Sequence, residues 1–317
     1  MSAGDATPDT RPEGDGVVVW RVSDGLAGHD NQSLGLAEAL ARRVPVDPHT
    51  LPARALGGAL ARWLSGRYPE LDPLPGPDLI IGAGHGTHAT MLAARRCRGG
   101  RAVVLMSPSL PVACFDLCIA PAHDGLRGPR VIVTRGALNR VRPRPPRTGG
   151  PGLVLLGGPS RHFLWRDDSV LEKTGAVLAA ASDSEWIIAT SRRTPAALAA
   201  KLESLTRAGV TLVRHESTGS GWLAEALARA SRVWVTEDSV SMIYEALTSG
   251  APVGLIGLDR AGTDGVCAEI DRLAAEGWVR RIADHGQAPG LEPPPEVLDE
   301  AGRCAGILLE RWPELRR

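Results

Sequence analysis

Short apolar runs alternate along the chain with longer stretches in which apolar residues recur every three or four positions. The run at 17–22 is typical of a buried strand. The stretch at 33–43, where Leu36 and Leu40 lie one turn apart, is typical of a helix packed on a sheet. Strands that alternate with helices predict a parallel α/β fold. Further strands are predicted at 79–81, 103–106, 117–119 and 131–133.

A segment rich in proline, arginine and glycine at 142–152 interrupts the alternation, because such a segment can hold neither a helix nor a central strand. The pattern then restarts, with strands predicted at 153–156, 186–189, 210–213, 233–235 and 253–256. We therefore expect a disordered tail at 1–15, a first α/β domain at 16–141, a linker at 142–152, a second α/β domain at 153–295 and a closing helix at 296–317 that packs back on the first domain.

Composition narrows the classes of function. The 317 residues have a formal net charge of zero, which argues against nucleic acid as a partner. The five cysteines are scattered without a Cys-x-x-Cys pair, so neither a zinc site nor a disulfide framework is indicated. No apolar run approaches the roughly 18 residues of a membrane span, and the N-terminus has no apolar signal core. We expect a cytoplasmic protein, with membrane contact limited to the periphery of the inner membrane.

The stretch 233–256 is the most informative part of the chain. A buried strand is followed by a polar elbow, a helix, and the turn Gly250-Ala251-Pro252 before the next strand. Open α/β sheets bind ligands at the carboxyl ends of their strands, where free N–H groups of a helix favour an anion. Glu245, inside the helix, suits a ribose diol. The candidate nucleotide-binding residues here are Glu237, Asp238, Ser239, Ser241 and Glu245.

Two further loops in the second domain follow predicted strands. The first contributes Gly157, Gly158 and Ser160. The second contributes Ser191, Arg192, Arg193 and Thr194 just before a helix. Guanidinium groups match phosphate oxygens bidentately, so we interpret this loop as a diphosphate site.

In the first domain, the loop 23–29 joins the first strand to the first helix. Gly25 and Gly28 permit close approach of the backbone, and Asp24 and His29 are candidate catalytic residues, since an imidazole can act as a general base. The alternative is a tight turn with Asp30 or Asn31 as helix cap. The loop matches neither a Gly-x-Gly-x-x-Gly motif nor a Walker motif.

Three other features remain open. His85 and His88 lie three apart in a second glycine-rich loop, but without a third ligand we expect no metal. His123, next to Asp124, is either an acid–base pair or a structural cluster. The apolar stripe of 56–64, with neighbouring arginines, is interpreted as core or dimer packing in preference to docking on a membrane surface.

Several motifs together resemble the mitochondrial fission ELM family, which includes a plant mitochondrial fission factor and bacterial proteins assigned as glycosyltransferases. The motifs are Ser23-Asp24-Gly25 with Gly28-His29 and Gln32, FDLCIAPAHD (115–124), Gly136-Ala137-Leu138-Asn139, GGPSRH (157–162), TSRRTP (190–195) and VTEDSVSM (235–242). The resemblance implies a GT-B-like fold of two Rossmann-type domains whose parallel sheets face a cleft. The chain departs from the family pattern at 84–86, 106–109 and 219–222, which bears on the acceptor more than on the donor.

The expected function is transfer of a sugar from a nucleoside-diphosphate sugar to an unidentified acceptor, lipid-linked or of the cell envelope. The second domain would bind the donor and the first the acceptor, with His29 or Asp24 as base. No metal and no further cofactor is expected, because helix dipoles and cationic side chains can stabilise the leaving diphosphate. The alternatives are a sugar-nucleotide epimerase of the same fold and a non-catalytic adaptor associated with a membrane.

Overall fold

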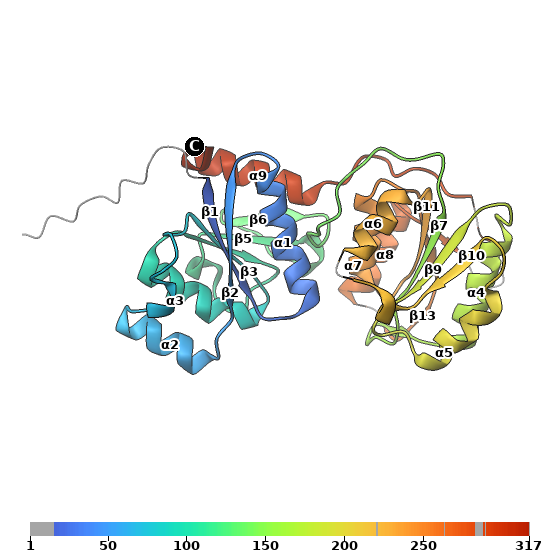
Figure 1. The fold of residues 1–317 in the computed structure, drawn as a ribbon, viewed down its shortest axis with the longest axis horizontal. Coiled ribbons are helices and arrows are strands. Elements are labelled where there is room, and N and C mark those ends of the chain that lie inside the picture. Colours follow the sequence, from blue (N-terminus) through green and yellow to red (C-terminus); the bar gives the residue numbers. More distant parts are fainter. Residues whose placement is uncertain (1–15, 220, 263, 283–287, 289, 317) are drawn as a thin grey trace, which may run out of the picture. The chain divides into compact units, whose positions relative to one another are not determined.

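The computed structural model describes residues 16–219, 221–262, 264–282, 288 and 290–316 (Figure 1). Its contacts divide the chain into two compact units. The first unit comprises residues 16–120, 126–134 and 301–316, and the second comprises 121–125 and 135–300. The tail expected at 1–15 lies outside the described residues.

The first unit is a parallel six-stranded sheet flanked by helices. The strand order is β2-β1-β3-β4-β5-β6, so the chain starts near one edge and crosses to the other. Its core gathers Trp20, Ile80, Met91 and Phe115, all fully buried between sheet and helices. The elements are β1 (Val17–Ser23), α1 (Ala27–Ala41), β2 (Val46–Pro52), α2 (Leu56–Ser65), β3 (Leu79–Ala83), α3 (His88–Arg98), β4 (Arg101–Leu105), β5 (Leu117–Pro121) and β6 (Val131–Thr134).

Helix α9 (Glu300–Arg311) completes the first unit from the far end of the chain. Arg303 Nη2 donates to the carbonyl oxygen of Val133 at 2.7 Å. Arg101 pairs with Glu314 at 2.5 Å and places its guanidinium 4.9 Å from the centre of the Trp312 ring. The first unit is therefore discontinuous in sequence.

The second unit repeats the architecture, with the parallel strand order β10-β9-β7-β11-β12-β14. Strand β7 lies between β9 and β11, so the carboxyl ends of these three strands are neighbours. The elements are β7 (Gly152–Leu156), β8 (Phe163–Leu164), α4 (Asp167–Ala179), β9 (Trp186–Thr190), α5 (Ala196–Lys201), β10 (Val210–Val213), α6 (Trp222–Arg229), β11 (Arg232–Thr236), α7 (Val240–Thr248), β12 (Val253–Ile256), β13 (Asp259–Arg260), α8 (Gly265–Ala275) and β14 (Arg280–Ile282).

The parallel α/β prediction is confirmed, and the structure adds to it at the edges. β2 contains Pro48 and Pro52 and is mostly exposed, which an edge strand tolerates but an apolar pattern does not reveal.

The segment 142–152 lies in the second unit. There the carbonyl oxygen of Gly150 accepts from Ser231 Oγ at 2.9 Å, and a Cβ on Gly250 would come within 1.9 Å of the carbonyl oxygen of Arg144. Residues 142–151 are irregular but pack against regular structure, and β7 begins at Gly152.

Candidate functional site

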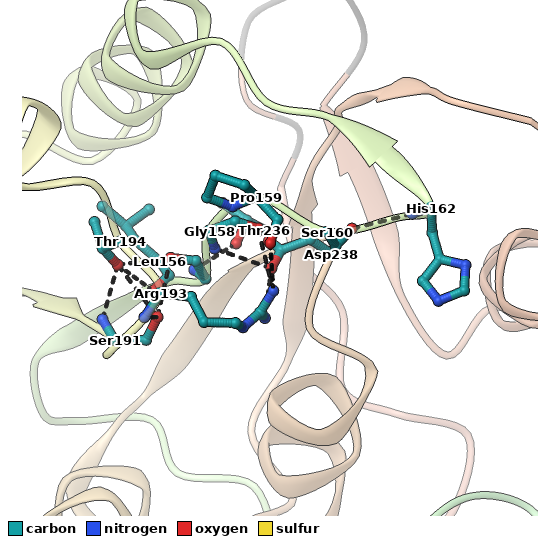
Figure 2. A network of polar contacts seen from close by, with 11 residues as sticks. Leu156, Gly158, Pro159, Ser160, His162, Ser191, Arg193, Thr194, Thr236 and Asp238 are labelled. Carbon is teal, nitrogen blue, oxygen red and sulfur yellow. Dashed lines mark hydrogen bonds and ion pairs between the residues drawn. The ribbon is translucent and has the colours of Figure 1, made fainter.

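The loops that follow β7, β9 and β11 are tied together at the carboxyl edge of the second sheet (Figure 2). Their hydrogen bonds join residues far apart in sequence. Gly157 N donates to Thr236 Oγ1 at 2.8 Å, and Ser191 Oγ donates to the carbonyl oxygen of Gly157 at 3.0 Å. Thr194 Oγ1 lies 2.6 Å from that same carbonyl oxygen and accepts from Ser191 N at 2.8 Å. The three loops thus form one polar network.

Asp238 is the centre of this network. Its Oδ2 accepts from Arg193 Nη2 at 2.6 Å and from Gly158 N at 3.0 Å. The carboxylate is completely buried, whereas the Arg193 side chain is 43% exposed. Oδ1 of Asp238 is also buried, and no described residue donates a hydrogen bond to it. Burial raises the pKa of Asp238, although Thr236, the Gly158 N–H and Arg193 act in the opposite direction.

Both glycines of the first loop are required by space. A Cβ at Gly157 would lie 2.1 Å from Asp238 Oδ2, and a Cβ at Gly158 would lie 2.0 Å from the carbonyl oxygen of Arg193. Arg193 also donates from Nη1 to the carbonyl oxygens of Gly158, at 3.2 Å, and Pro159, at 3.3 Å. The guanidinium of Arg193, which we expected to bind phosphate, therefore holds loops of the protein together.

Arg192 is exposed like Arg193, but its side chain makes no hydrogen bond or ion pair with the described residues. Ser239 is buried at the start of α7 and makes no side-chain cap there. Ser241 is exposed and Glu245 half-buried, both on α7. A helix start without a side-chain cap and a guanidinium without a partner among the described residues are each able to receive an anion.

Glu237 lies apart from this network. It is buried, forms an ion pair with Arg281, and accepts from Leu258 N at 2.9 Å. Its carboxylate therefore joins the loop after β11 to Leu258 and to β14. The sequence pattern did not separate this structural role from the role of Asp238.

The sequence analysis did not predict the pair formed by His162 and Asp264. His162 Nδ1 bonds Asp264 Oδ2, while Oδ1 of Asp264 caps α8 by accepting from Val266 N at 2.9 Å and Cys267 N at 3.0 Å. The His162 ring lowers the pKa of Asp264 to about 2. Ser160 Oγ accepts from His162 N at 3.3 Å, which fixes the end of the first loop. An aspartate directly before an amphipathic stretch is a helix-start signal that could have revealed half of this pair.

In the first unit, Asp24 and His29 form a pair. Asp24 Oδ2 lies 2.8 Å from His29 Nδ1, and Asp24 Oδ1 accepts from Leu26 N at 3.1 Å. The second glycine-rich loop lies against them: a Cβ at Gly84 would come within 2.2 Å of the His29 ring, and one at Gly86 within 3.3 Å of Asp24. A carboxylate on Nδ1 leaves Nε2 as the ring nitrogen open to a substrate proton.

The capping alternative for this loop is wrong. Helix α1 begins at Ala27, with Leu26 as its N-cap, so Gly28 and His29 lie inside its first turn. Asp30 is paired with Arg21 at 2.5 Å instead of capping. Gly25 has φ +79°, which favours glycine, whereas a Cβ at Gly28 would meet nothing within 4 Å.

His88 and His123 have other surroundings. His88 is buried edge-on to Phe115, 5.3 Å between ring centres, with Ser109 Oγ 3.3 Å from its Nδ1. Burial lowers the pKa of His88. His123 Nε2 lies 3.6 Å from Asp124 Oδ1. Among the described residues, no three or more His, Cys, Asp or Glu side chains are arranged to hold a metal ion.

In the described ranges, none of the helices combines the length and the apolar character needed to cross a bilayer.

The chain matches one family model and one curated protein. The family model described as mitochondrial fission ELM1 matches residues 27–312. An uncharacterised protein of Rickettsia prowazekii is 24% identical, with 74% of this chain and 82% of that protein covered.

Among solved structures, the UDP-GlcNAc 2-epimerase of Methanocaldococcus jannaschii superposes with a TM-score of 0.53 at 13% identity, covering 93% of this chain and 99% of the other. The S. aureus MnaA–UDP co-structure gives a TM-score of 0.51 at 11% identity, covering 95% and 89%. Similarity at this level of identity establishes the fold, which is GT-B.

Proposed function

The chain belongs to the mitochondrial fission ELM1 family, and we propose that it is a glycosyltransferase whose second unit binds a nucleoside-diphosphate sugar. One observation carries the proposal. Three loops at the carboxyl ends of adjacent parallel strands are locked together by Asp238, with glycines where any side chain would collide and a helix start without a side-chain cap. Sheets of this kind bind nucleotides at that edge.

The residues have different roles in this proposal. Arg192, exposed and unengaged, is the cation for the diphosphate, with the N–H groups at the start of α7 beside Ser239. Glu245 is assigned to the ribose diol. Arg193 and Asp238 keep the loops in place, and Gly157 and Gly158 let these loops pack closely against one another.

The first unit would bind the acceptor. His29, held by Asp24, is the base that removes the acceptor's proton as the sugar is transferred. Arg192 and the α7 dipole would stabilise the negative charge on the departing nucleoside diphosphate.

A second candidate is epimerisation of the sugar nucleotide. It is favoured by the named activity of the Methanocaldococcus jannaschii protein, whose fold this chain shares. An epimerase changes the sugar nucleotide without an acceptor, so product analysis in the absence of any acceptor distinguishes the two.

Calorimetric titration with UDP and with a panel of nucleoside-diphosphate sugars tests the proposal. Binding that is weakened by Arg192→Ala, but not by the control Arg207→Ala at another exposed arginine, would support the site. Failure of every nucleotide to bind a folded protein would favour the non-catalytic adaptor.

A further inference from the structure

Helix α2 carries an apolar face that the protein itself leaves uncovered. We define the α2 face as Leu56, Leu60, Trp63 and Leu64, whose exposed fractions are 72%, 49%, 42% and 65%. Of the ten residues in the helix, Ala59 alone is buried. Large apolar side chains gathered on one exposed face mark an interaction surface.

The expectation that this stripe packs in a core is wrong. α2 packs against α3 on the outside of the first unit, not against the sheet (Figure 1). Cys97 Sγ of α3 lies 3.7 Å from the carbonyl oxygen of Arg62, so the helix backbone is held while the leucines face outward.

Arginines border the α2 face. Arg96 lies with its guanidinium 4.9 Å from the centre of the Trp63 ring and donates from Nε to the carbonyl oxygen of Trp63 at 2.7 Å. Segments 54–72 and 88–98 together contain six arginines and two acidic residues, and a third acid, Asp116, pairs with Arg95 at 3.0 Å. One of those acids, Glu70, is shared by Arg54 and Arg62, and the Arg62 hydrogen bond lowers its pKa to about 2. The border is net positive.

We propose that the α2 face docks on an anionic lipid surface, with its leucines and Trp63 among the acyl chains and its arginines at the headgroups. An amphipathic helix of this length lies in the interface rather than crossing it. Arg67, exposed, and Arg96 would contact lipid phosphates.

Charge decides against a second copy of this chain as the occupant. A two-fold contact between two copies would set one arginine border against the other. The chain's own residues 1–15 contain no large apolar residue besides Met1, so they lack side chains that match the leucines and Trp63.

Co-sedimentation of the full chain with vesicles tests the proposal, and it does so whether or not the protein is an enzyme. Binding should require phosphatidylglycerol in phosphatidylcholine vesicles and should weaken as salt rises. Leu60→Glu combined with Leu64→Glu should lower the partition coefficient by at least about tenfold. Arg67→Glu should lower it by roughly fivefold or more. Both leucines are exposed, so the variants should fold as the wild type does.

Leu164→Glu is the matched control, because Leu164 is 54% exposed but lies on β8 in the second unit. It should bind vesicles like the wild type. Equal binding to neutral vesicles, no binding at all, or an equal loss in the control would overturn the proposal. So would a wild-type dimer, seen by light scattering, that the Leu60/Leu64 variant converts to a monomer.

Discussion

Arg193 and Asp238, 45 positions apart, form an ion pair in which the carboxylate is fully buried and the guanidinium is 43% exposed. The pair closes the loop after β7 between the loops after β9 and β11. The two adjacent arginines of the TSRRTP motif consequently have different tasks.

Replacing each arginine separately should separate binding from stability. Arg192→Ala should weaken binding of UDP by about tenfold to a hundredfold, since a charged hydrogen bond to phosphate contributes roughly 1.5–3 kcal/mol. Its free energy of unfolding should change by about 0.5 kcal/mol or less. Arg193→Ala should lower the free energy of unfolding by about 1–3 kcal/mol, because a buried acceptor loses its donor. Denaturant titration and calorimetry on both variants give the comparison; equal destabilisation by both would contradict it.

The raised pKa of Asp238 predicts a pH dependence of stability. The folded protein holds this proton more tightly than the unfolded chain, so its stabilising effect is complete below the ordinary pKa of 3.8 and is lost as pH rises through the raised value. Between pH 3.8 and the raised pKa, the free energy of unfolding of the wild type should fall relative to that of Asp238→Asn. Above the raised pKa, the difference between the two proteins should stay constant. In Arg193→Ala the window should extend to higher pH, because Arg193 lowers this pKa. A wild-type curve parallel to that of Asp238→Asn throughout would rule the effect out.

Glycine substitutions should discriminate close packing from mere loop composition. Gly158→Ala places a methyl group 2.0 Å from a backbone oxygen that cannot move without its loop, so we expect a loss of about 1–3 kcal/mol in unfolding free energy. Gly28→Ala meets no atom within 4 Å and lies in the first turn of α1, so it should be neutral or slightly stabilising. Thermal unfolding of the two variants is the measurement, and a neutral Gly158→Ala would show that the loop can open.

Turnover tests the role of His29 once a donor and an acceptor are known. His29→Ala should lower kcat by roughly 10²–10⁴ while affinity for UDP is unchanged, because the nucleotide is assigned to the other unit. His29→Asn, which is polar but not a base, should not restore the rate. Gly84→Ala should also reduce turnover, since its methyl group would displace the imidazole. Full activity in His29→Ala would remove it from the mechanism.

Local patterns predicted the architecture well. The strands at 79–81, 153–156 and 233–235 are short, wholly apolar runs, and the structure buries all three in parallel sheets. A short run made only of apolar residues predicts a buried strand by itself, because no information from distant residues is needed. The polar elbow at 236–239 is likewise visible, because a strand must end before a helix begins.

Partnerships within the site could not be predicted in this way. Arg193 and Asp238, or His162 and Asp264 at 102 positions apart, meet only after the sheet has formed. Nothing local separates Arg192 from Arg193, or Glu237 from Asp238, because each pair consists of adjacent residues of like charge. The α2 stripe misled for the opposite reason: its spacing shows that one face is apolar but not what covers it.

Helix α9 has a consequence for synthesis on the ribosome. Residues 301–316 belong to the first unit, yet the whole second unit is made before them. When β6 is synthesised, Arg303 is not yet present to donate to Val133, and Arg101 has not yet met its partner Glu314. Residues 135–300 can already fold before these contacts form. A chain that ends at residue 300 and has been released from the ribosome should contain a finished second unit and an unfinished first one, the reverse of the usual amino-to-carboxyl order.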